Sequence, residues 1–300
     1  MKLGLMLDVG NPGGLDKIIE DVRSMANDGF PSVWMAQVFG PDALTTIALV
    51  GREVDGIELG TAVVPTYPRH PMMLAQQALT ANAAIGGRLA LGICLSHQIV
   101  IEGMWGYSFD KPARHMKEYL SALMPLLHEG QVTFEGDTIK AMGTVGIPGS
   151  TPPPVLLAAL APRMLQLAGG VADGTVTWMT GPKTVEGHIV PTITKAAADA
   201  GRPAPRVAVG LPVCVTDDPD GARERAAREF QIYGSLPSYR AMLDREGADG
   251  PADVAVVGDE KAVEAGLQAA VDAGATDVVA AAYGSTEDRD RTRQLLTSLL

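Results

Sequence analysis

Short apolar runs alternate with longer amphipathic segments along almost the whole chain. The apolar runs are rich in Val, Leu and Ile and are continuous rather than alternating, which is typical of strands buried on both faces of a parallel sheet. In the segment 15–29, apolar residues recur at helical spacing and share one face. They are Leu15, Ile18, Ile19, Val22, Met25 and Ala26. The pattern therefore predicts an α/β protein with parallel strands.

Eight strand–helix units follow one another. The predicted strands are 3–7, 32–36, 57–64, 88–94, 155–160, 175–179, 207–215 and 276–282. Eight units in 300 residues predict a (β/α)8 TIM-type barrel, a fold that typically takes about 250 residues. A doubly wound sheet is the competing architecture. That fold usually carries a glycine-rich phosphate loop after its first strand, and DVGNPGG (8–14) matches such a loop poorly.

Strands four and five are separated by an irregularly long segment. We expect a single domain, residues 1–300, with an insertion at about 98–153. The insertion contains a predicted helix from about Pro112 to His128, a hairpin-like stretch, VTFEGDTIK, and the Gly/Pro-rich stretch GTVGIPGSTPPP.

Charge and cysteine content restrict the possible partners. The net charge of −11 repels nucleic acid and anionic membranes, so we expect neither as a partner. An anionic cofactor must then be held by a local patch or by backbone N–H groups. Cys94 and Cys214 lie in apolar runs and are expected to be free thiols. The N-terminus has no long apolar segment and no apolar run reaches 18 residues, which predicts a cytoplasmic protein.

The usual catalytic motifs are missing at the places where a barrel enzyme would carry them. The active site of such a barrel lies at the C-terminal ends of its strands. The sequence has no G-x-S-x-G, Walker A, H-E-x-x-H or C-x-x-C motif, so no metal site is expected. The difficult chemistry would then fall to an organic cofactor. The predicted strand ends are mostly apolar, which suits a flat hydrophobic ring system.

Four segments carry a resemblance to a known family. They are GTAVVPTYPRHP (60–71), GGRLALGICLSH (86–97), AALAPRMLQLAGGVADGTV (158–176) and VVGDEKAVEAGLQAAVDAGATDVVAA (256–281). In this order they resemble the bacterial luciferase-like (LLM class) flavin and deazaflavin oxidoreductases. Within that class the chain is similar to the branch that uses coenzyme F-420, an 8-hydroxy-5-deazaflavin. The resemblance spans nearly the whole chain and implies a TIM-type barrel.

The resemblance implies where the cofactor lies. Its ring is expected against a bulge with a non-prolyl cis peptide at the end of strand three, here Ala62–Val63. The further cofactor-binding residues that it implies are Val64, Thr66, Leu95, Ser96, Ala158, Ala159, Leu160, Ala161, Arg163 and Lys183. The phosphate is expected at the start of the helix after strand five. Many relatives have glycines where this chain has Leu160 and Ala161. The side chains of these two residues leave less room for a phosphate to approach the backbone.

Two residues are candidates for the catalytic chemistry. His97 occupies a position after strand four where the deazaflavin dehydrogenases often have an acidic residue. A neutral imidazole can donate or accept a proton near pH 7, so His97 is the candidate general acid/base. Gln37 stands where the family often has a histidine after strand two. It could hydrogen-bond a substrate carbonyl but cannot carry a proton.

The implied function is hydride transfer between the deazaflavin C5 and a small organic substrate. One alternative is an FMN-dependent monooxygenase of the same fold, which would work with a partner reductase and O2. A second alternative is a non-catalytic flavin-binding relative, because Leu160, Ala161 and His97 all depart from the family pattern. By analogy with the family, a homodimer is expected.

Overall fold

The central sheet closes on itself. A computed structural model describes residues 2–8 and 13–300. Each barrel strand pairs in parallel with the next, and the last pairs with the first. The order is β1 (Lys2–Met6), β2 (Ser32–Met35), β3 (Glu58–Thr61), β5 (Leu89–Cys94), β8 (Val155–Leu157), β9 (Gly174–Trp178), β10 (Arg206–Val215) and β12 (Asp277–Ala282). The predicted (β/α)8 barrel is confirmed. Residues 9–12 of the DVGNPGG segment lie outside the described residues.

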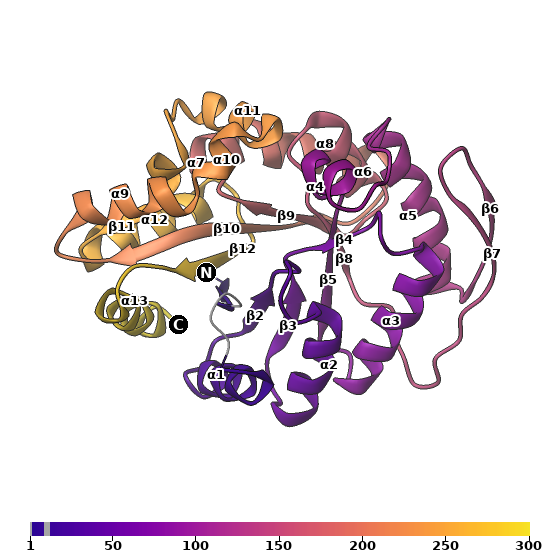
Figure 1. Cartoon of the computed structure of the whole chain (residues 1–300), viewed down its shortest axis with the longest axis horizontal. Helices are drawn as coiled ribbons and strands as arrows, with labels where there is room; N and C mark the ends of the chain where they lie inside the picture. The colour runs from indigo at the N-terminus through magenta and orange to yellow at the C-terminus, as the bar shows by residue number, and fades with distance from the viewer. Residues whose placement is uncertain (1, 9–12) are drawn as a thin grey trace.

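Helices connect the strands and cover the outside of the barrel (Figure 1). They are α1 (Leu15–Asn27), α2 (Ala43–Glu53), α3 (Pro71–Ala84), α5 (Pro112–His128), α6 (Pro162–Gly170), α8 (Val190–Asp199), α12 (Glu260–Asp272) and α13 (Thr286–Ser298). Helix α8 continues from α7 (Pro182–Thr184) through a π-helical turn, Val185–Ile189. Proline begins α3, α5 and α6, as expected for a residue whose fixed φ suits the first helical position.

The third barrel strand is interrupted, whereas the sequence predicted one continuous strand over 57–64. Strand β3 ends at Thr61, and a two-residue strand, β4 (Val64–Pro65), continues the pairing with β5. The peptide bond between Ala62 and Val63 is cis, as the family resemblance implies. The backbone N–H of Ala62 still donates to the Met35 carbonyl at 2.8 Å, so the break stays anchored to β2.

Two segments add elements to the regular alternation of barrel strands and helices, and we call them the first and second excursions. The first follows β5 and contains α4 (Gln98–Gly103) and a hairpin, β6 (Gln131–Glu135) and β7 (Lys140–Thr144). Helix α5 lies in the same segment, but it packs against α3 and α6 and so acts as the fourth helix of the ring. The hairpin lies outside that ring, beside α3 and α5 (Figure 1).

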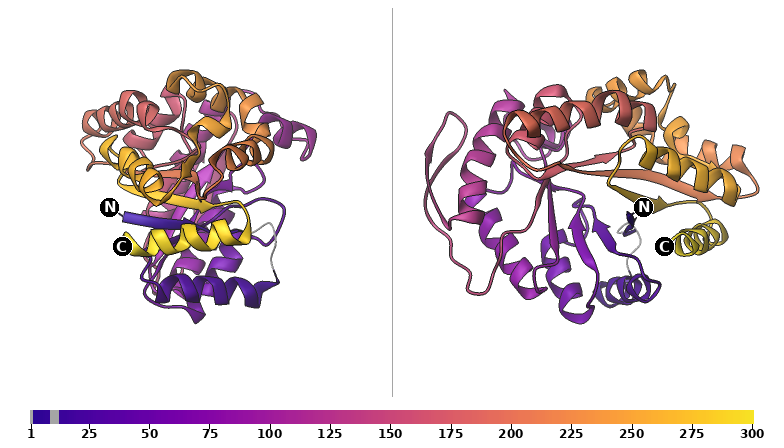
Figure 2. Two further views of the ribbon diagram at one scale, coloured as in Figure 1. Left: turned by 90° about the vertical axis from the view of Figure 1, so that its left-hand side faces the viewer. Right: turned by 180° about the vertical axis from the view of Figure 1, so that it is seen from behind.

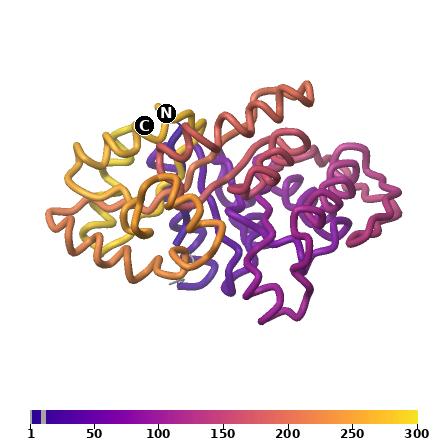
Figure 3. Tube along the Cα trace, turned by 90° about the horizontal axis from the view of Figure 1, so that it is seen from above, coloured from indigo at the N-terminus to yellow at the C-terminus, as the bar shows by residue number. Residues whose placement is uncertain are grey.

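The second excursion, residues 216–259, follows β10. It contains α9 (Pro219–Glu229), α10 (Gln231–Ser235), α11 (Pro237–Glu246), a 3-10 turn (Pro251–Val254) and β11 (Val256–Gly258). Strand β11 pairs with the far end of β10, beyond the barrel. The hairpin of the first excursion and strand β11 of the second lie at opposite ends of the molecule (Figure 3), whereas α4 and α11 approach each other above the barrel.

Two apolar layers make the core. The larger lies between the strands and the surrounding helices. The smaller fills the barrel itself, where Trp34 packs against one aliphatic side chain from each of several strands. A Cβ on Gly60 would come within 2.3 Å of the Trp34 ring, so glycine there makes room for the indole. Below Trp34, Arg206 pairs with Glu58 and Asp277 and closes the N-terminal end of the barrel.

The first strand and the last helix lie side by side (Figure 2). Arg289 of α13 pairs with Asp8, just after β1, at 3.0 Å. Among the residues that the structure describes, no helix has both the length and the apolar character that crossing a membrane requires.

Candidate active site

The C-terminal ends of the strands surround an apolar floor. Met6, Ala62 and Val63 are partly exposed and pack on the cluster inside the barrel. Strand alternation also turns Cys94 and Trp178 inward, because Ala90 and Val176 of the same strands belong to that inner cluster. Burial raises the pKa of the Cys94 thiol to about 12, so this floor carries no charge at neutral pH. Two of its residues, Ala62 and Val63, are those against which the resemblance predicts the cofactor ring.

The loop after β5 brings three predicted residues to this floor. Leu95, Ser96 and His97 are all partly exposed. Ser96 has a left-handed backbone (φ 60°), and its N–H donates to the Cys94 sulfur at 3.2 Å. Met179, at the end of β9, has a similar φ of 52°. Non-glycine residues in this region are uncommon and tend to cluster at functional sites, so these strand ends are the candidate active site.

His97 is half-buried at the start of α4. Its side chain makes no capping hydrogen bond to that helix, which leaves both ring nitrogens available to a ligand. Burial lowers the pKa of His97, so the imidazole is neutral near pH 7. Its ring centroid lies 5.9 Å from that of Tyr239 on α11.

Gln37 has a defined orientation after β2. Its side-chain oxygen accepts a hydrogen bond from the Ala43 N–H at 2.8 Å, at the start of α2. The amide nitrogen therefore supplies the donors that remain for a ligand. In the same loop Asp42 caps α2 through the Thr45 N–H and pairs with Arg69 at 2.5 Å. Arg69 is thus engaged in holding the loops after strands two and three together.

Three residues near the break in strand three are engaged within the protein. Val64 is fully buried, and its side chain packs in the outer core. Thr66 is also buried; its N–H donates to the Cys94 carbonyl at 2.9 Å, and its hydroxyl lies 3.4 Å from the His115 Nε2. His70 lies between α3 and the hairpin, with its Nε2 at 2.9 Å from the Lys140 carbonyl oxygen. Of the predicted residues at this break, Ala62 and Val63 have the more accessible side chains.

The predicted phosphate site lies at the start of α6. Ala158 is held by its N–H to the Ile93 carbonyl at 2.8 Å, and Ala159 is buried beside it. The Leu160 carbonyl is fixed by His188 from the π-helical turn, at 2.8 Å. Ala161 is the N-cap of α6 and supplies no capping side chain, while Arg163 is exposed in the first turn. An uncapped helix start beside an arginine fits an anion.

Lys183 lies at the start of α7, where the backbone N–H groups already have hydrogen-bond acceptors within the protein. The N–H groups of Lys183 and Thr184 donate to the two carboxylate oxygens of Glu246, at 3.2 and 2.8 Å. Glu246 is the last residue of α11, so this carboxylate fastens α11 to α7. The Lys183 side chain is exposed and forms no ion pair among the described residues. The α6 start, whose N–H groups have no capping side chain, is therefore the better place for a phosphate.

Helices α10 and α11 bring residues to the site that the sequence did not indicate. Tyr233 of α10 has its ring 6.3 Å from that of Trp178, and Tyr239 contacts His97. Neither tyrosine belongs to a strand end, and α10 has no buried residue that would mark a packed face. The positions of these two tyrosines depend on how the second excursion packs over the barrel. No local sequence pattern predicts that packing.

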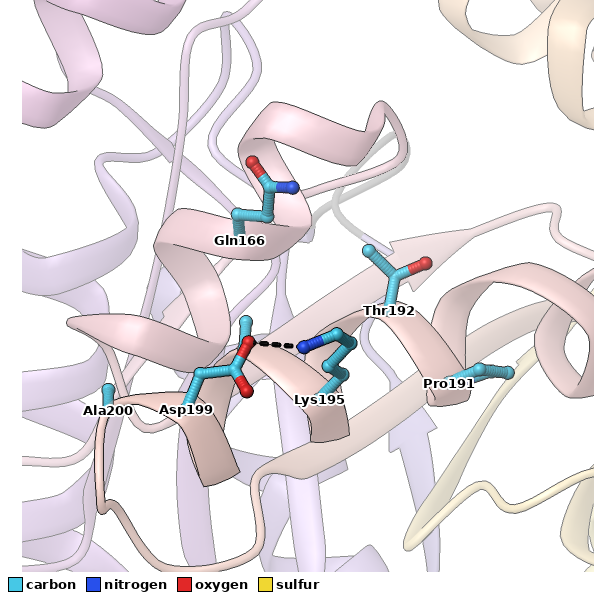
Figure 4. Close-up of a pocket in the computed structure, with 7 residues that line it drawn as sticks. Gln166, Pro191, Thr192, Lys195, Asp199 and Ala200 are labelled. Carbon is cyan, nitrogen blue, oxygen red and sulfur yellow. Dashed lines mark hydrogen bonds and ion pairs between the residues drawn. The ribbon is translucent and has the colours of Figure 1, made fainter.

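A hollow of about 580 Å³ on the outside of the barrel does not coincide with this site (Figure 4). It lies between α6 and α8 and is lined by residues such as Gln166 and Thr192. Lys195 and Asp199 at its edge pair with each other at 2.6 Å. None of the predicted site residues lines it.

Comparison with known proteins gives a family match along almost the whole chain. Residues 1–293 match the family of luciferase-like monooxygenases. A 5,10-methylenetetrahydromethanopterin reductase of Methanolobus tindarius is 30% identical over 244 residues, which are 81% of this chain and 74% of the relative.

The fold is shared with solved structures of other proteins. The coenzyme F-420-dependent tetrahydromethanopterin reductase of Methanopyrus kandleri superposes with a TM-score of 0.79 at 22% identity, covering 99% of this chain and 96% of the other. The oxygenating constituent of 3,6-diketocamphane monooxygenase from Pseudomonas putida, in complex with FMN, gives a TM-score of 0.77 at 18% identity, covering 99% and 96%. Both cofactors thus occur among proteins with this fold.

Proposed function

Because the chain belongs to the luciferase-like monooxygenase family, we propose that it is a coenzyme F-420-dependent oxidoreductase. It would transfer hydride between the deazaflavin C5 and a small organic substrate. One observation carries this proposal: an uncharged apolar floor at the strand ends lies beside an uncapped helix start with an exposed arginine. A flat ring with a phosphate-bearing tail needs these two surfaces together.

The residues present fit this cofactor. Ala62 and Val63 offer small, partly exposed side chains against which a ring can lie. The first turn of α6 and Arg163 would bind the phosphate, with Lys183 adding positive charge at the rim. The bound cofactor supplies hydride at its C5; the protein supplies orientation and a water-poor floor.

His97 would donate or accept the proton that is transferred together with the hydride. Its ring nitrogens are not used in capping α4, and it stands at the end of β5 beside the floor. A general acid/base in this position contributes roughly 100- to 10,000-fold to a rate. The Gln37 amide N–H groups would orient a substrate oxygen, since the Gln37 oxygen is already engaged with α2.

An FMN-dependent monooxygenase is the second candidate, favoured by the FMN-bound structure with the same fold. Both cofactors carry a flat ring system and a phosphate, so the floor and the α6 start would suit either. The two reactions make different demands on the rest of the site, because a monooxygenase must also admit O2 and receive electrons from a reductase.

Cofactor titration distinguishes the two. We expect purified protein to bind F-420 with micromolar or tighter affinity and FMN at least 10-fold more weakly. Arg163→Ala should weaken F-420 binding at least 10-fold, because one charge-assisted hydrogen bond is worth roughly 1.5–3 kcal/mol. Arg52→Ala, on the outer helix α2, is the control and should bind like wild type. Preferential FMN binding would refute the F-420 assignment, and binding of neither would favour a non-catalytic relative.

A further inference from the structure

Four aromatic rings form a continuous surface at the barrel mouth. The ring centroids of Trp178 and Tyr233 are 6.3 Å apart, those of Tyr233 and Tyr239 are 4.8 Å apart, and those of Tyr239 and His97 are 5.9 Å apart. We call this set the aromatic wall. It joins the end of β9 to the end of β5 through helices α10 and α11 of the second excursion, so it adjoins the apolar floor.

The wall is held in place from behind. Phe230 packs edge-on against Trp178 at 5.9 Å, and Trp178 also contacts Met179 and Leu243 in a small apolar cluster. Glu246 fastens the end of α11 to α7 through two backbone hydrogen bonds. The rings are therefore part of a packed unit and present a fixed apolar surface to a ligand.

The wall carries no charge at neutral pH. Burial raises the pKa of Tyr239 and of Tyr233, and burial lowers the pKa of His97, so all three favour their neutral forms. The carboxylate of Glu246, at the end of α11, accepts hydrogen bonds from backbone N–H groups of α7. An ionised substrate group pressed against these rings would lose its hydration without gaining a counter-charge from the wall itself, which costs several kcal/mol. Arg163 and Lys183 are not part of the wall, and we propose that they bind the cofactor phosphate.

One donor in the wall has no partner. The Trp178 indole N–H is buried and makes no hydrogen bond within the described part of the chain. The Tyr233 hydroxyl lies close enough for this N–H to oppose the burial-induced rise of the Tyr233 pKa, but the two do not reach hydrogen-bonding geometry. A buried N–H left unpaired costs about 1–3 kcal/mol, and a substrate oxygen would satisfy it.

Resting on the proposed function, we propose that the substrate is an uncharged cyclic or aromatic carbonyl compound, bound against the aromatic wall. Its ring packs on Trp178 and Tyr239, and its oxygen accepts a hydrogen bond from the indole N–H. In the reductive direction the carbonyl carbon would gain hydride from the reduced deazaflavin, the C=O π bond would break, and the oxygen would take a proton from the His97 imidazolium, which would become the neutral imidazole. The products are the alcohol and the oxidised deazaflavin, so electrons and protons balance.

The test compares three ketones with reduced F-420 as the electron donor. Cyclohexanone and acetophenone are neutral, and 4-oxocyclohexanecarboxylate adds a charge to the first. We expect at least one neutral ketone to be turned over, with kcat/KM at least 10-fold above that of the carboxylate. Tyr239→Leu should lower kcat/KM for the neutral ketone about 10-fold, mainly through KM, with the Kd for F-420 changed less than 2-fold. Tyr239→Phe keeps the ring and should retain most activity.

A matched change outside the site controls for general damage. Phe134→Leu, on the β6–β7 hairpin, also replaces an aromatic ring by leucine and should leave kcat/KM unchanged. Equal or better turnover of the carboxylate, or a Tyr239→Leu enzyme with wild-type kinetics, would overturn the substrate class. So would F-420-loaded protein that turns over none of the three. Failure of F-420 to bind at all would instead refute the cofactor assignment, so the two failures are distinguishable.

Discussion

His97 combines three properties that suit proton transfer: it is half-buried, it is neutral near pH 7, and its ring does not cap its own helix. We expect His97→Ala to lower kcat with F-420 and a neutral ketone by about 100-fold or more, since that is the usual contribution of a general acid/base. The Kd for F-420 should stay within 2-fold, because His97 is proposed to act on the substrate and is not among the residues proposed to hold the cofactor. Fluorescence titration and steady-state kinetics measure the two quantities.

The pH profile separates proton transfer from a packing role. Burial lowers the pKa of His97 below its ordinary value of 6.5. In carbonyl reduction the imidazolium is the donor, so kcat should fall as pH rises through this lowered pKa. The His97→Ala enzyme should show no such fall over the same range. An identical profile in both enzymes would mean that another group supplies the proton.

At the scale of the element, the end of strand three depends on a glycine in its neighbour. Gly92 of β5 is buried, and a Cβ there would come within 2.0 Å of the Thr61 carbonyl oxygen and 2.9 Å of the Val63 side chain. The Thr61 hydroxyl also hydrogen-bonds both backbone groups of Gly92. The backbone of β5 is therefore in direct contact with the floor on which the ring is proposed to lie.

Gly92→Ala should destabilise the protein and disturb that floor. Overpacking against a backbone atom costs roughly 1–3 kcal/mol. We expect a loss of that size in the free energy of unfolding, together with at least 10-fold weaker F-420 binding. Gly146→Ala is the control, since a Cβ at this position would meet no atom within 4 Å, and it should change stability by less than about 0.5 kcal/mol. Wild-type stability and affinity in the Gly92 variant would show that the strand adapts.

The elements differ in how far they could be predicted. The strands of the barrel were readable because continuous apolar runs such as that of β10 are buried on both faces. Strand β11 was missed because its three residues pair only with the extension of β10. The site was predictable where it follows a strand end, as at His97. The sequence did not predict Tyr233 and Tyr239 as part of the candidate site, because they lie on helices whose position is set by tertiary contacts.

At the scale of the whole molecule, the two ends of the barrel have different tasks. The C-terminal end carries the apolar floor, the helix start and the aromatic wall. The N-terminal end is closed by Arg206, which donates to Glu58 and Asp277 at distances of 2.6–3.1 Å and lies 5.1 Å from the Trp34 ring. This division is general in such barrels, where chemistry collects at one end and stability at the other.

Arg206→Leu should therefore lower stability without changing the site. Removing Arg206 leaves Glu58 and Asp277 with Lys2 alone as a counter-charge, at 3.4 and 3.3 Å, and costs up to about 3 kcal/mol at pH 7. Burial alone would raise the pKa of Asp277, but hydrogen bonds from Arg206 hold it below its ordinary value of 3.8. That contribution is present above pH 3.8 and is lost as pH falls through the lowered pKa, so the difference from wild type should shrink towards acid pH.

Urea unfolding at a series of pH values, with F-420 titration of the folded protein at pH 7, tests this division. The control is Lys195→Ala, which removes an exposed i,i+4 pair with Asp199 and should cost less than about 0.5 kcal/mol. The folded Arg206→Leu protein should bind F-420 within 2-fold of wild type, because the Trp34 layer separates the ionic cluster from the floor. A loss of affinity in parallel with stability would mean that the ionic end also sets the geometry of the mouth, and the two ends could not be assigned separate tasks.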